Sequence, residues 1–152
     1  MDNKLTKKEV REEIATIEKT ISSCETARFG DYLPIFHSFA DGAYVREIHI
    51  PAGELLVGKI HRHSHPNFLM KGKVTVLTEE GDTELLEAPQ SIISPAGTKR
   101  VVFVHEDCVW ITVHVTEETD LEKIEAYVIA PDYNDEELTA NQVSALEQLW
   151  HG

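Results

Sequence analysis

The sequence predicts a mainly β protein, built as one antiparallel sandwich or barrel with a helix before it and short helices after it. Two observations predict this fold class. Between about residues 33 and 129, short apolar-rich runs alternate with turn residues, and no repeated strand–helix alternation interrupts them. The length of 152 residues also fits one ordinary domain. We therefore expect an N-terminal amphipathic helix within residues 1–28, the barrel within 29–131 and a helical tail within 132–152.

The first segment has the periodicity of a helix. Its apolar residues follow one another at spacings of four, three and four: Val10, Ile14, Ile17 and Ile21. Thr6 followed by Glu9 forms a capping box, so we expect a helix over about residues 6–22. One such helix does not stabilise itself, so its apolar stripe must pack on the β domain or on another subunit.

Turn residues divide the middle of the chain into short strands. Glycine and proline supply the backbone angles that tight turns need, for example at Asp41-Gly42 and Pro95-Ala96-Gly97. We expect strands near residues 33–39, 43–50, 55–63, 67–71, 73–79, 83–87, 91–94, 99–104, 108–115 and 124–129. In the tail, the spacing of Leu138, Val143, Leu146 and Leu149 predicts one or two short amphipathic helices.

The charge balance excludes some partners. The chain has 27 acidic and 14 basic residues and a formal charge of −13, which disfavours direct binding to nucleic acid or to anionic membranes. We find no apolar run of about 18 residues and no apolar core of a signal peptide near the N-terminus. Cys24 and Cys108 lie far apart and form no Cys-x-x-Cys motif, so we interpret both as structural thiols. A cytoplasmic protein is expected.

Three histidines stand at alternate positions in one predicted strand. Side chains two residues apart project from the same face of a strand, so His61, His63 and, before Pro66 ends the run, His65 point together. Imidazole nitrogens that converge in this way can share one metal ion. A further ligand must come from another strand, and His114 is the best candidate because it shares a strand face with Trp110.

Plainer interpretations exist for each histidine. A histidine on a surface strand is usually solvated, and His63 and His65 also fit a polar rim. The solvated interpretation is given to four others: His37, His49, His105 and His151.

Two stretches resemble the sequence motifs of the cupin family. Gly58 to Gly72 is similar to the first cupin motif, with His61 and His63 at its paired histidines. Pro95-Ala96-Gly97 resembles the turn of the second motif. The resemblance spans roughly residues 33–129 and implies a jelly-roll barrel, also called a double-stranded β-helix. The chain is likewise similar to small cupin-like proteins encoded by tailed phages and prophages. This second resemblance implies that a phage-encoded chain would act in the host cytoplasm or in the virion.

The chain departs from the cupin motifs at two positions. The glutamate of the first motif is missing, and Asn67 or His65 stands near its place. Arg100 stands where the second motif has a histidine, so His114 would have to supply that ligand.

The sequence leaves two functions open. In the first, His61, His63, His65 and His114 bind a divalent metal ion (Zn, Fe, Ni or Mn) inside the barrel, and a small ligand lies against Asn67, Arg100 and Trp110. No general base is evident, so no reaction follows. In the second, the chain is a non-catalytic oligomeric module, such as a structural or accessory component of a phage. The amphipathic termini favour a homo-oligomer in either case.

Overall fold

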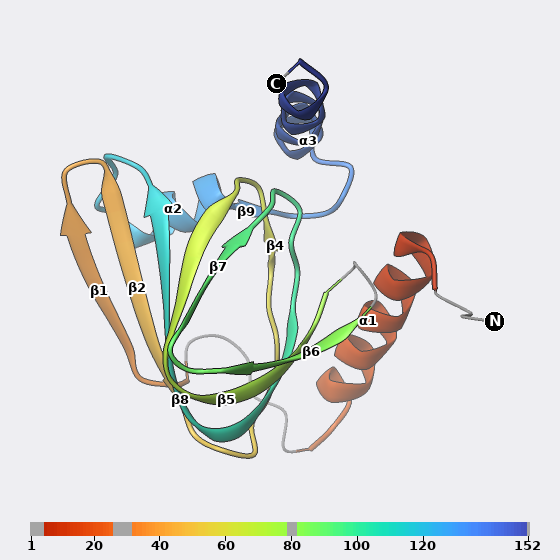
Figure 1. The fold of residues 1–152 in the computed structure, drawn as a ribbon, viewed down its shortest axis with the longest axis vertical. Helices are drawn as coiled ribbons and strands as arrows, with labels where there is room; N and C mark the ends of the chain where they lie inside the picture. Colours follow the sequence, from red (N-terminus) through yellow and green to blue (C-terminus); the bar gives the residue numbers. More distant parts are fainter. Residues whose placement is uncertain (1–4, 26–31, 79–81, 152) are drawn as a thin grey trace.

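The computed structural model describes residues 5–25, 32–78 and 82–151 and shows a mainly β fold with helices at both ends (Figure 1). The elements follow in the order α1 (Lys7–Ser22), β1 (Ile35–Ala40), β2 (Ala43–Ile50), β3 (Leu55–Val57), β4 (Ile60–His61), β5 (His65–Leu77), β6 (Thr83–Glu87), β7 (Gln90–Ser94), β8 (Val101–Val115), α2 (Leu121–Val128), β9 (Ile129–Ala130) and α3 (Glu136–His151).

Two long antiparallel strands, β5 and β8, organise the sheet. They pair with each other along most of their length, and each exchanges its outer neighbour halfway. The first half of β5 pairs with β7 and the second half with β6. The first half of β8 pairs with β3 and the second half with β2, which also carries β1. This exchange rolls the β5–β8 ribbon around a common interior, which is the jelly-roll arrangement that the sequence predicted (Figure 1).

The bend in β5 lies at Gly72. The pairing of β5 with β8 shifts register between Leu69 and Val74, and Gly72 has a φ of +101°. A Cβ atom at this position would lie 2.5 Å from the carbonyl oxygen of Asp107, so only glycine fits. The two strands predicted at 67–71 and 73–79 are therefore one bulged strand, and those predicted at 99–104 and 108–115 are likewise one strand, β8.

The interior of the barrel is apolar at one end. Its buried residues are Ile50, Leu69, Val74, Val76, Leu86, Val104, Cys108 and Trp110. Burial raises the pKa of the Cys108 thiol to about 11, which agrees with the predicted structural role. Cys24, in contrast, is exposed.

Helix α1 forms as predicted and packs on the β domain. The Glu9 backbone N–H donates to the Thr6 hydroxyl at 3.2 Å, and the Thr6 N–H donates to the Glu9 carboxylate at 2.9 Å, which completes the capping box. Val10 and Ile14 are fully buried against Val101 at the start of β8. The apolar stripe of α1 is therefore covered within the chain.

The strand predicted at 124–129 is wrong, because this segment is helix α2. Asp120 caps it by accepting a hydrogen bond from the Lys123 N–H at 3.1 Å. Ile124 and Val128, four residues apart, are buried together against Tyr44 of β2. Residues four apart share one face of a helix and also one face of a strand, so the spacing of these two residues alone did not distinguish the two structures.

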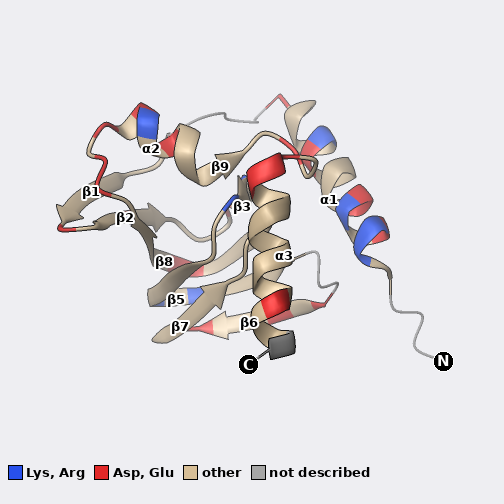
Figure 2. Cartoon of the chain, turned by 90° about the horizontal axis from the view of Figure 1, so that it is seen from above, with Lys and Arg blue, Asp and Glu red and all other residues tan. Residues whose placement is uncertain are grey.

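Helix α3 lies across one end of the barrel, as the view from above shows (Figure 2). Leu138 is fully buried against Ile60 and Ala130, on the short β4–β9 pair. The Asn141 amide donates to the Arg62 carbonyl at 2.7 Å. The predicted tail is thus a single helix that covers the β4–β9 end. In the described part of the chain, no helix is both long and apolar enough to cross a membrane.

Candidate functional site

Three of the four predicted histidines meet inside the barrel. His61 ends β4, His65 begins β5 and His114 lies near the end of β8. The ring centroids of His61 and His65 are 4.4 Å apart, those of His65 and His114 are 4.9 Å apart, and those of His61 and His114 are 5.7 Å apart. His65 and His114 expose only 3% and 6% of their surface. We refer to these three side chains as the histidine cluster.

His63 lies outside the histidine cluster. Strand β4 ends at His61, so the alternation that was expected to align His63 with His61 does not continue. The His63 ring packs on Tyr127 with centroids 4.6 Å apart, and its Nδ1 lies 3.2 Å from the Asn141 amide nitrogen. Its Nε2 lies 3.5 Å from a carboxylate oxygen of Glu137, at the start of α3. The structure therefore pairs His61 with His65 instead of His63.

Two backbone carbonyls orient the rings of the cluster. The Nδ1 atom of His61 lies 3.4 Å from the Thr98 carbonyl oxygen, and that of His65 lies 3.3 Å from the His63 carbonyl oxygen. A carbonyl only accepts hydrogen bonds, so these contacts place the proton on Nδ1 and leave the lone pair on Nε2. The Nε2 atom of His65 is buried and has no hydrogen-bond partner among the described residues.

The environment keeps the cluster neutral. Burial, followed by the proximity of His65 and His114, lowers the pKa of His61 to about 3. Burial, with His65 and Arg46 nearby, lowers the pKa of His114 to about 4. The pKa of His65 is lowered for the same first reason. Near neutral pH all three imidazoles are therefore uncharged, the state in which imidazole binds a metal ion.

Asn67 and Trp110 are joined in a buried polar network beside the cluster. The Trp110 indole N–H donates to the Asn67 side-chain oxygen at 3.1 Å. The Asn67 amide donates to the Ser94 hydroxyl oxygen at 2.7 Å. Asn67 is 1% exposed, so these bonds satisfy groups that water does not reach. Two of the three predicted ligand-binding residues, Asn67 and Trp110, thus have their main polar groups occupied by other side chains.

Arg100 joins the same network from the other side. One of its terminal nitrogens donates to the Ser94 hydroxyl, and its guanidinium carbon lies 5.7 Å from the centre of the Trp110 ring. Burial lowers its pKa to about 10, so the group stays charged at neutral pH. Within residues 5–25, 32–78 and 82–151, no carboxylate forms a salt bridge with it.

The sequence did not identify Ser94 or Thr98 as part of the site. Ser94 lies opposite His65 in the β5–β7 pairing, and Thr98 follows the predicted Pro95-Ala96-Gly97 turn. Their position beside that turn was the available signal, because the turn brings the chain back toward His61.

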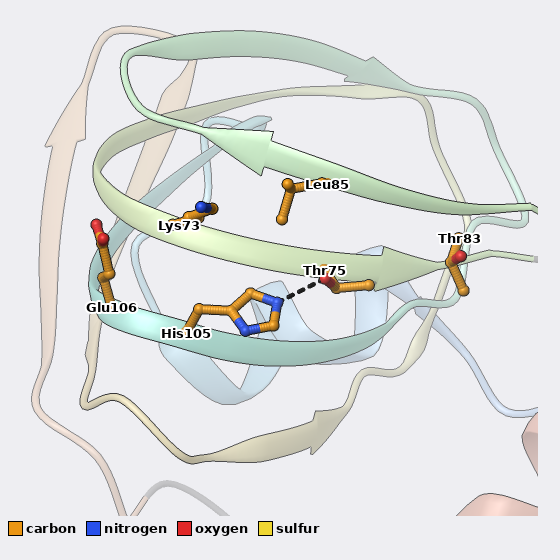
Figure 3. A pocket seen from close by; sticks show the side chains of 6 residues that line it. All are labelled: Lys73, Thr75, Thr83, Leu85, His105 and Glu106. Carbon is orange, nitrogen blue, oxygen red and sulfur yellow. Dashed lines mark hydrogen bonds between the residues drawn. The ribbon is translucent and has the colours of Figure 1, made fainter.

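Two hollows of the outer surface have none of the three cluster histidines in their lining. One is an open depression over β5, β6 and β8, where the His105 Nε2 atom lies 2.6 Å from the Thr75 hydroxyl (Figure 3). His105 is exposed there, in agreement with its solvated interpretation. His37 is also exposed and His49 is half-buried, whereas the side chain of His151 lies outside the described residues.

No protein-family model and no curated protein matches this sequence. Among solved structures, the chain is similar to a cupin-2 domain protein from Shewanella frigidimarina, at 10% identity and a TM-score of 0.47 over 66% of this chain and 92% of that one. It is similar to a protein with a double-stranded β-helix domain from Klebsiella pneumoniae, at 14% identity and a TM-score of 0.49 over 61% and 85% of the two chains. It is also similar to an acetylacetone dioxygenase from Acinetobacter johnsonii, at 20% identity and a TM-score of 0.46 over 57% and 65%. At these identities the similarity concerns the fold alone.

Proposed function

We propose that the barrel is a binding module in which His61, His65 and His114 hold a divalent metal ion beside a small ligand. The observation that carries the proposal is the buried Nε2 atom of His65, which has no partner among the described residues and belongs to a ring within 5 Å of the other two ring centroids. A buried polar atom without a partner costs free energy unless something binds to it. A metal ion is a natural partner for a neutral imidazole nitrogen.

The donor set fits a transition-metal ion. Imidazole nitrogens suit Zn, Fe and Ni. Mn, the fourth candidate, prefers oxygen ligands and fits this donor set less well. The carbonyls that accept from the Nδ1 atoms of His61 and His65 are the usual outer partners of metal-binding histidines. An ion held by three imidazoles keeps open positions and would supply Lewis acidity to a bound ligand.

The three imidazole rings must rotate before they can bind one ion together. In the described residues, no three His, Cys, Asp or Glu side chains are already placed to hold a metal ion. The separations of the ring centroids, 4.4 to 5.7 Å, are small enough for rotation about the side-chain bonds to aim the nitrogens at one point. Thr98 and Tyr44, which contact His61 and His114, limit how far those two rings can turn.

Metal titration of the chelator-treated protein tests the proposal. We expect Zn²⁺ or Ni²⁺ to bind at one ion per chain and to raise the melting temperature by about 5 °C or more at saturation. His65→Ala abolishes binding, whereas His105→Ala, which removes an exposed histidine from the outer surface, leaves it unchanged. Equal binding by both variants, or no binding by the parent protein, would overturn the proposal.

A specific surface favours a second function, that of a non-catalytic oligomeric module such as a phage structural or accessory component. On the outer side of α3, Val143, Leu146 and Leu149 expose 48%, 66% and 83% of their surface. An apolar helix face of this kind suits contact with another copy of the chain. Light scattering checks it against the chain mass of 17.1 kDa. A stable oligomer that Leu146→Glu with Leu149→Glu makes monomeric, in a protein that takes up no metal, would favour this function over the first.

A further inference from the structure

The counter-ion of Arg100 is missing from the described part of the chain. The guanidinium has five N–H donors, and one hydrogen bond, to Ser94, is formed. The Trp110 ring lies on one side of it at 5.7 Å and contributes no acceptor atom of its own. Arg100 is half-buried, and none of the chain's 27 acidic residues is found paired with it in the described part of the structure.

The Ser94 hydroxyl also has an unused donor. Its oxygen accepts from the Asn67 amide and from Arg100, which occupies both of its lone pairs. Its own proton has no acceptor among the hydrogen bonds of the described residues. The hydroxyl and the guanidinium therefore present N–H and O–H donors from adjacent positions, and both suit an oxyanion.

The same group lies near the histidine cluster. Ser94, which accepts from Arg100, lies directly opposite His65 in the β5–β7 pairing. An acid side chain at this place would have balanced both the guanidinium and a metal ion. The chain has placed neutral groups there instead: Asn67, Ser94 and Trp110.

We infer that the barrel takes a small ligand with an oxyanion group, a carboxylate or a phosphoryl group, which binds to Arg100 and Ser94 while the rest of the ligand faces the histidine cluster. This inference rests on the proposed binding function and names the chemical class of its ligand. Asn67 and Trp110 act as positioning residues, since Asn67 holds Ser94 and Trp110 holds Asn67. A planar guanidinium matches a carboxylate or phosphate with two parallel hydrogen bonds.

Fluorescence of Trp110 provides the test, because its ring lies beside the guanidinium. The chain has two tryptophans, so a Trp150→Phe background, excited at a wavelength that its four tyrosines do not absorb, makes Trp110 the only emitter. Chelator-treated protein is titrated with sodium acetate, inorganic phosphate and neutral acetamide at constant ionic strength. We expect a saturable change with acetate or phosphate and none with acetamide. Saturation by acetate identifies a carboxylate ligand and saturation by phosphate a phosphoryl ligand, and either supports the inference.

Matched variants separate Arg100 from general charge effects. Arg100→Gln should weaken anion binding at least tenfold, and Arg100→Lys should weaken it less. Lys73→Gln removes the same charge from the outer depression of Figure 3 and should leave binding within twofold of the parent. Absence of any saturable response, or an equal response in the parent and Arg100→Gln, would overturn the inference.

Metal uptake distinguishes the two proposals. Metal uptake without an anion response overturns the inference and leaves the metal site standing. An Arg100-dependent anion response in a protein that takes up no metal supports the inference and removes the metal. Unchanged metal uptake by Arg100→Gln shows that the variant is folded, and its melting temperature provides a second check.

Discussion

Arg62 and Arg100 differ in how their charges are balanced. Arg62, with a side chain 12% exposed, donates to both carboxylate oxygens of Asp135 at 2.9 and 3.1 Å. It also donates to the carbonyls of Ala126 and Tyr127. The Asp135 contact raises the pKa of Arg62, whereas burial without a carboxylate lowers that of Arg100.

The difference between these regions separates a structural charge from one that awaits a ligand. The Arg62 region is complete within the chain, because it joins β4 to α3 through groups that satisfy one another. The Arg100 region retains donors without acceptors in the described part of the chain. Burying a charge without a partner opposes folding, and an anionic ligand would remove that cost at Arg100.

The largest effect on stability is expected from breaking the Arg62 region. Arg62→Gln should lower the melting temperature by about 5 °C or more, because the Asp135 carboxylate and two carbonyls lose their donor. Arg100→Gln should leave the melting temperature unchanged or raise it, since a buried unpaired charge disappears. Differential scanning calorimetry of the metal-free proteins checks both signs.

Lys59→Gln is the control for the Arg62 experiment. Lys59 pairs with Glu125 on the surface, where both side chains are more than half exposed, and such pairs contribute about 0–1 kcal/mol. A loss of melting temperature in Arg62→Gln no larger than in Lys59→Gln would contradict the structural role of Arg62.

A smaller loss is expected at Asn67, between the Arg100 region and the histidine cluster. Asn67→Leu leaves the Trp110 indole N–H without its acceptor and should cost about 1–3 kcal/mol of unfolding free energy, measured by urea denaturation. It should also weaken acetate binding, because Ser94 loses the partner that holds it. A variant that retains full stability and full acetate binding would argue against the network. Thr75→Val, on the outer surface, is the control.

The fold was predictable because its signals are local and repeated. The capping box of Thr6 and Glu9, the turn residues and the alternation of buried residues along β5 each specify structure over a few residues. The segment 124–129 was misassigned because its two buried residues fit a helix and a strand equally until their partner, Tyr44, is known. Long-range contact, which the sequence does not display, decided that case.

The candidate site was predictable in part. His114 shares the inner face of β8 with Trp110, as alternation predicted, because β8 is a regular strand there. His63 was placed with His61 on the same reasoning, but β4 ends after two residues and the chain bends. The sequence could not show that Arg100 has no counter-ion among the described residues. That depends on how far each of the 27 acidic residues lies from Arg100 in the folded chain.

The free energy of unfolding should depend on pH because His61 and His114 are buried and neutral in the folded chain. The unfolded chain binds protons at these histidines below about pH 6.5, whereas folded His61 and His114 resist protonation until about pH 3 and 4. Their contribution to stability is therefore complete above pH 6.5 and is lost as the pH falls toward 4. Arg46, His65 and His63 are the groups that act on His114.

Substitution of His114 makes this dependence measurable. In metal-free protein, the unfolding free energy falls as the pH is lowered from 7 to 5, and this fall should be about 1–2 kcal/mol smaller in His114→Gln than in the parent. Urea denaturation at each pH measures the unfolding free energy. His105→Gln, an exposed histidine, should follow the parent. Identical pH profiles for all three proteins would show that His114 titrates normally in the folded state.

The smallest effect is expected from substitution of His63. This substitution tests whether His63 belongs to the Arg62 region or to the histidine cluster. His63 contacts Tyr127, Asn141 and Glu137, which places it with Arg62 and α3. His63→Ala should therefore cost about 1 kcal/mol or less of stability and leave Zn²⁺ or Ni²⁺ uptake unchanged. His65→Ala, two residues along the chain, should abolish that uptake. Loss of metal in His63→Ala with retention in His65→Ala would restore the ligand set that strand alternation first suggested, and it would require β4 to extend to His63 when the ion binds.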